Sequence, residues 1–81
     1  MAQRVAPLSV VEAHEELWRR RPTHDASPAE WAAFHRHSAE VYSAAAQVDV
    51  ANRAEGSQYA VFAIRRAREI EHRLDPSVDE S

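Results

Sequence analysis

The sequence predicts an all-α fold, in which a short N-terminal helix packs on an antiparallel hairpin of two longer helices. The 81 residues include a single glycine and few β-branched runs, which is typical of helical chains. Apolar residues recur at steps of three and four in three stretches, and helix start signals precede them. We therefore expect one helical domain over 1–81, with helices at about 10–21, 28–48 and 53–74. The ends, 1–8 and 76–81, are expected to be flexible.

The first helix is predicted to begin after Ser9, because Ser9 and Glu12 have the spacing of a capping box. It ends before Pro22, which cannot continue a helix. Its last turn contains three consecutive arginines, which suit the negative end of the helix dipole. The apolar side of this helix is formed by Val10, Ala13, Leu17 and Trp18.

The second helix has the clearest start signal in the chain. Ser27 is a good N-cap, Pro28 suits the first helical position, and Glu30 completes a capping box. A 3–4 repeat follows and predicts one packing face, formed by Trp31, Phe34, Ser38, Val41, Ala45 and Val48. This period favours a partner helix that crosses at a shallow angle.

The partner is predicted to be the third helix, which follows a tight turn at Asp49 to Asn52. Either Asp49 or Asn52 could cap the N-terminus of this helix. A turn at Glu55 to Gln58, using Gly56, is the alternative, and one unbroken helix is a third option. The third helix repeats small residues at the same stepping: Gly56, Ala60, Ala63 and Ala67, followed by Ile70 and Leu74. Small side chains on both helices would let their axes approach closely.

A run of six apolar residues, from Tyr59 to Ile64, suggests an interaction surface. A helix that is apolar nearly all round is covered on more than one side, and the first helix is too short to cover both. We therefore expect a non-catalytic protein–protein interaction module, which binds a protein partner or a second copy of itself. The expected contact residues are Trp18, Tyr59, Val61, Phe62 and Arg66, with Phe62 as the anchor and Arg66 on the rim.

The alternative function is a regulator that binds nucleic acid through two arginine clusters. These clusters are Arg19, Arg20 and Arg21 in the first helix and Arg65, Arg66 and Arg68 in the third. Arginine binds phosphate in a bidentate manner, but the net charge is −3 and no aromatic residues are interleaved with either cluster. The first cluster suits a helix C-terminus, and Arg65 has the spacing to pair with Glu69. Roles at a helix end and in ion pairs therefore explain the arginine clusters better than binding of nucleic acid does.

The sequence predicts no catalytic, metal or cofactor site. Cysteine is absent, as are a glycine-rich phosphate loop and a nucleophile elbow. His35 and His37 are two residues apart and would point to different sides of a helix. Glu69 and His72 have the spacing used in di-iron helical bundles, so a metal-binding bundle is a remote alternative that requires two chains. Ser38 is expected to bond back to a backbone carbonyl.

The expected location is the cytoplasm, because the sequence has neither a membrane-spanning apolar run nor a signal-peptide core. All ten basic residues are arginine and alanine is abundant, which suggests a GC-rich bacterial genome.

The stretch SPAEWAAFHRHSAEVYSAAAQVD, Ser27 to Asp49, resembles a group of short uncharacterised actinobacterial helical proteins. They share its Trp, the aromatic before a basic pair, and the AEVY segment. The chain departs from their histidine-rich pattern after Asp49. The resemblance implies a small helical accessory protein that acts beside a DNA-binding regulator.

Overall fold

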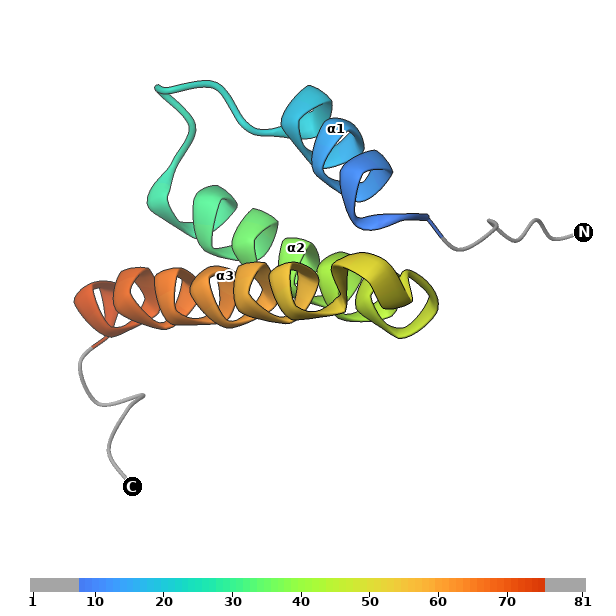
Figure 1. The fold of residues 1–81 in the computed structure, drawn as a ribbon. Coiled ribbons are helices and arrows are strands. Elements are labelled where there is room, and N and C mark those ends of the chain that lie inside the picture. Colours follow the sequence, from blue (N-terminus) through green and yellow to red (C-terminus); the bar gives the residue numbers. More distant parts are fainter. Residues whose placement is uncertain (1–7, 76–81) are drawn as a thin grey trace, which may run out of the picture.

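The computed structural model describes residues 8–75, which form three α-helices and one short 3₁₀ turn (Figure 1). Their order is α1 (Val10–Arg20), α2 (Pro28–Val48), η1 (Val50–Asn52) and α3 (Arg53–Leu74). The predicted all-α fold is confirmed: α2 and α3 form a closely packed hairpin, and the short α1 lies across it. The predicted flexible ends lie outside the described residues except for Leu8.

Both predicted capping boxes start their helices. The Ser9 hydroxyl accepts from the backbone N–H of Glu12 at 3.1 Å, and the Glu12 carboxylate accepts from the backbone N–H of Ser9 at 3.1 Å. Ser27 and Glu30 make the same exchange at 3.1 and 3.0 Å. α1 ends one residue earlier than expected, because Arg21 is extended, as the residue before a proline tends to be.

The turn between the long helices lies at 49–52, the first of the three alternatives. Asp49 caps it, since its carboxylate accepts from the backbone N–H and the side-chain amide of Asn52. Asn52 itself makes no side-chain cap bond to α3, so its expected capping role is wrong. The Arg53 guanidinium donates to the carbonyl oxygens of Ala46 and Gln47 at 3.0 and 3.2 Å. It thereby satisfies acceptors that the end of α2 leaves open.

Small residues form most of the interface between α2 and α3. The buried residues of α3 are Gly56, Ala60, Ala63, Ala67 and Ile70, which agrees with the predicted face except that Leu74 is exposed. The buried residues of α2 are Ala32, Ser38, Ala39, Tyr42, Ala45 and Ala46. A Cβ added at Gly56 would lie 2.8 Å from Val10 Cγ2 and 3.1 Å from Ala46 Cβ. The three helices therefore meet at Gly56 with no room for a side chain.

The predicted packing face of α2 is partly wrong. Ser38 and Ala45 are buried as expected, but Trp31 and Phe34 are only half-buried and Val48 is exposed. The true interface is rotated toward the alanines at 32, 39 and 46, because close helix packing selects small side chains rather than large ones. The side chains of Trp31 and Phe34 consequently lie beside the interface, whereas Tyr42 is buried.

An ion pair joins the two long helices away from the turn. The Arg36 guanidinium donates to both carboxylate oxygens of Glu71, each at 2.6 Å. This bidentate pair lowers the pKa of Glu71 and raises that of Arg36. It fixes the register of α2 and α3 at the end opposite the 49–52 turn.

We expect Ala45→Leu to destabilise the protein by about 1–3 kcal/mol, because Ala45 is only 1% exposed and a larger side chain would overpack the interface. Ala44→Leu is the matched control, because the neighbouring alanine is exposed. Its effect should stay within about 0.5 kcal/mol. Chemical denaturation of both variants measures the difference, and equal effects would contradict the observed packing.

Candidate functional site

Helix α1 is held on the hairpin at its N-terminal end. The Asp49 carboxylate accepts a hydrogen bond from the Val10 backbone N–H at 2.9 Å, which satisfies a free donor in the first turn of α1. One turn further along, His14 Nδ1 and the Tyr42 hydroxyl are 2.8 Å apart. The first bond joins α1 to the hairpin turn and the second joins it to α2. Figure 1 shows the chain after α1 arching back to the start of α2. Asp49 therefore closes the hairpin turn and also positions α1.

A cleft of about 380 Å³ lies between the three helices. It is lined by both tryptophans, both tyrosines and both phenylalanines of the chain, so every aromatic Phe, Trp and Tyr side chain lies at this one place. We call it the aromatic cleft. Its lining is His14, Leu17, Trp18, Arg21, Trp31, Phe34, His35, Ser38, Tyr42, Tyr59, Phe62 and Ala63.

Three rings pack together where α1 contacts the hairpin. The ring centroids of Tyr42 and Tyr59 are 5.1 Å apart, and His14 stacks on Tyr59 at 5.8 Å. Burial, with a smaller contribution from Tyr59, raises the pKa of Tyr42. These contacts make this part of the cleft a fixed floor.

The wall that α2 provides is also fixed in place. The Trp31 indole N–H donates to the Thr23 carbonyl oxygen at 3.2 Å, which ties the ring to the loop before α2. The Phe34 ring meets Trp31 edge to face, with centroids 5.8 Å apart, and the His35 ring lies 5.7 Å from Trp31. Burial, and to a smaller extent Arg66, lowers the pKa of His35, which favours its neutral form.

The sides of the cleft from α1 and α3 remain open to solvent. Trp18 is 62% exposed and Phe62 is 52% exposed, although both line the same cavity. The Arg21 guanidinium lies 3.8 Å from the centroid of the Trp18 ring, a cation–π contact that covers one ring face. Helix α1 thus borders the cleft without covering Phe62.

The structure separates the residues predicted to form the interaction surface. Trp18, Tyr59 and Phe62 line the aromatic cleft together. Val61, adjacent to Phe62 in the chain, lines a different groove between α2 and α3. Arg66 lies one turn along α3 from Phe62, in a neighbouring cavity. The predicted surface is therefore two surfaces, and Phe62 and Val61 belong to different ones.

The neighbouring cavity has a volume of about 560 Å³ and continues from the cleft, because Trp31 and His35 line both. We call it the arginine groove. It is lined by Ala26, Pro28, Trp31, His35, Arg66, Ile70, Arg73 and Leu74. Its charged lining residues are both arginines, in a chain whose net charge is −3.

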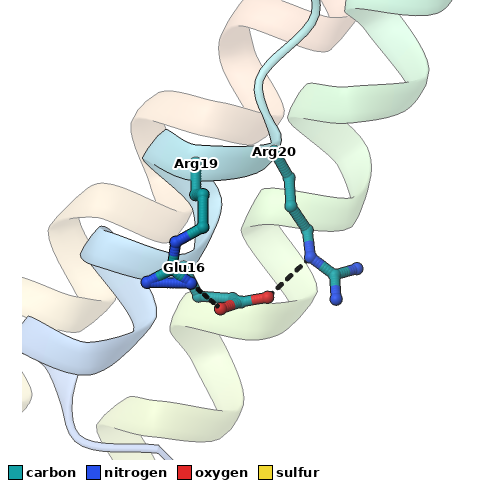
Figure 2. A network of polar contacts seen from close by, with 3 residues as sticks. All are labelled: Glu16, Arg19 and Arg20. Atoms are coloured by element: carbon teal, nitrogen blue, oxygen red, sulfur yellow. Dashed lines mark hydrogen bonds and ion pairs between the residues drawn. The ribbon is translucent and has the colours of Figure 1, made fainter.

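The predicted arginine clusters are largely engaged with the protein itself. Figure 2 shows that Glu16 binds two members of the first cluster, with Arg19 at 2.8 Å and Arg20 at 2.6 Å. In the second cluster Glu69 pairs with Arg66 at 3.0 Å, whereas we predicted Arg65. Residues three or four positions apart are neighbours on a helix, so Glu69 can reach either arginine. The side-chain conformers decide which of the two it pairs with.

Within residues 8–75, no three histidine or acidic side chains lie close enough together to bind a metal ion. Each helix in this part of the chain is too short or too polar to span a bilayer. Glu69 and His72 are exposed on α3. The Ser38 hydroxyl donates to the Phe34 carbonyl oxygen at 2.8 Å, as predicted. It is therefore a structural hydroxyl that faces the cleft wall.

The hydrogen bonds of the Asp49 carboxylate imply that the free energy of unfolding decreases at acid pH. Hydrogen bonds from Val10 and then Asn52 lower its pKa below the usual 3.8. A lowered folded-state pKa means that the stabilisation is complete above the unfolded pKa and is lost as the pH falls through the folded value. Asp49→Asn should therefore be less stable than the parent at neutral pH, and the two unfolding free energies should converge in acid.

Urea denaturation between neutral pH and about pH 2 measures this convergence. The exposed Glu40, whose carboxylate makes no hydrogen bond or ion pair within residues 8–75, provides the control, and Glu40→Gln should leave the profile unchanged. A constant difference between Asp49→Asn and the parent at every pH would show that the charge of Asp49 does not hold α1.

Comparison with known proteins gives no relative. No protein-family model matches the sequence, and no curated protein or solved structure matches it. The resemblance over Ser27 to Asp49 stays a prediction.

Proposed function

We propose that the protein is a non-catalytic binding module that takes part of a protein partner, or of a second copy, into the aromatic cleft. One observation carries the proposal: every Phe, Trp and Tyr side chain lines a single cavity that is open to solvent. Apart from Tyr42, these rings are not buried in the alanine-rich core of the hairpin. Their clustering at an open site is better explained by binding than by folding.

The chemistry of the cleft suits a protein ligand. Aromatic residues and arginine are the types enriched at interfaces, where they supply most of the binding energy. Trp18 and Phe62 are large, apolar and more than half exposed, and Arg21 lies against Trp18. Trp31 is already fixed by its hydrogen bond to Thr23, so little conformational freedom would be lost on binding.

The arginine clusters support the nucleic-acid alternative less well. Arg19 and Arg20 both pair with Glu16 of their own helix, and this carboxylate would compete with phosphate. We further propose that the module acts in the bacterial cytoplasm as an accessory to a regulator, as the resemblance implies. In that role the contact would be with the regulator protein rather than with its DNA.

Two adjacent residues of α3 provide the test. Phe62→Glu places a charge in the aromatic cleft, whereas Val61→Glu places it in the groove on the other side; the exposed fractions are 52% and 47%. Light scattering measures self-association, and co-purification from the native host measures partner binding. We expect Phe62→Glu to weaken the assembly by about 2 kcal/mol or more and Val61→Glu to preserve it.

Circular dichroism should show both variants folded, because both side chains are about half exposed. Equal behaviour of the two variants would contradict the assignment to the cleft. Tight binding of DNA or RNA at physiological salt would favour the alternative function. That binding should fall steeply with salt and be lost in the variant with Arg65→Ala and Arg66→Ala.

A further inference from the structure

We infer that the arginine groove, together with the aromatic cleft, receives an acidic amphipathic helix of a partner protein. This inference rests on the proposed function and specifies the chemistry of the partner. Three properties of the surface carry it: the surface follows α3, α1 lines the cleft but not the arginine groove, and the charged lining residues are all arginines.

The surface has the shape that a helix requires. Along α3 its lining recurs at steps of three and four, as Tyr59, Phe62, Arg66, Ile70 and Arg73, with the adjacent Ala63 and Leu74 also in the lining. From Tyr59 to Leu74 this row is roughly 22 Å long, which matches about four turns of a helix lying beside it. Trp31 and His35 of α2 border the opposite side in both cavities. Two parallel rows with an apolar floor form a helix-binding groove.

Helix α1 borders one end of this surface, at the aromatic cleft, and leaves Phe62 about half exposed. Helix α1 lines the aromatic cleft through His14, Leu17 and Trp18, but contributes no residue to the arginine groove. Ile70 is buried at the floor there, whereas Leu74 remains about half exposed. A fourth helix placed against α2 and α3 would cover this apolar surface and complete a four-helix arrangement.

The charge of the groove specifies the ligand. Arg66 and Arg73 line the arginine groove and Arg21 lines the cleft, while no Asp or Glu among residues 8–75 lines either cavity. The bond between Arg66 and Glu69 is exposed, so a carboxylate of the ligand can replace it at little cost. Acidic side chains flanking an apolar stripe are therefore the complement of this surface.

The test is a selection of displayed random peptides, about four helical turns long, on the purified protein. We expect the enriched peptides to be acidic, with large apolar residues at positions i, i+3 or i+4, and i+7. Each is then measured against two variants that lose the same charge. The variant with Arg66→Gln and Arg73→Gln alters the groove, and the variant with Arg65→Gln and Arg68→Gln alters α3 elsewhere.

The groove variant should bind about threefold to tenfold more weakly, the loss of two exposed ion pairs, and the control should bind as the parent does. Enrichment of basic, uncharged or non-helical peptides, equal losses in both variants, or no enrichment would overturn the inference. So would a dimer that buries the groove against a second copy. The protein-binding proposal would survive these outcomes if Phe62→Glu, unlike Val61→Glu, still disrupted the native assembly.

Discussion

The close approach of α2 and α3 is the constraint on which the rest of the structure depends. Alanines line both sides of the interface, and at Gly56 the neighbouring Val10 and Ala46 leave no space even for a Cβ. Close packing of small residues makes a rigid hairpin from limited apolar area. The ion pair of Arg36 with Glu71 and the cap at Asp49 then hold its two ends in register.

The close packing of small residues between α2 and α3 determines where the aromatic side chains lie. Apart from Tyr42, which is buried, they are excluded from the α2–α3 interface and gather beside it. Helix α1 is attached through Asp49 and His14 near the hairpin turn, so it borders the rings without burying Trp18 or Phe62. A small domain normally uses its largest side chains to fill a core. Here they surround an open cleft, and we propose that binding explains this departure.

The helices were predictable from the sequence because their determinants are local. Two capping boxes and the Asp49 turn depend on residues three positions apart, and the small-residue face of α3 is a simple repeat. The predicted packing face of α2 is partly wrong, because large apolar residues dominate the hydrophobic periodicity of its sequence. The close contact with α3 is made by alanines instead. The cleft itself depends on bonds that span 39 and 28 residues, from Val10 to Asp49 and from His14 to Tyr42. Sequence periodicity holds no information on such contacts.

The most direct test is the solvent accessibility of side chains in solution, measured by NMR as relaxation from a soluble paramagnetic probe. The structure predicts strong relaxation of the ring protons of Trp18 and Phe62 and protection of the methyl groups of Ala45 and Ala63. This pattern would show that the hairpin core is closed while the aromatic cleft is open. Protection of both rings in the monomer would contradict the account, because the aromatic residues would then form the core.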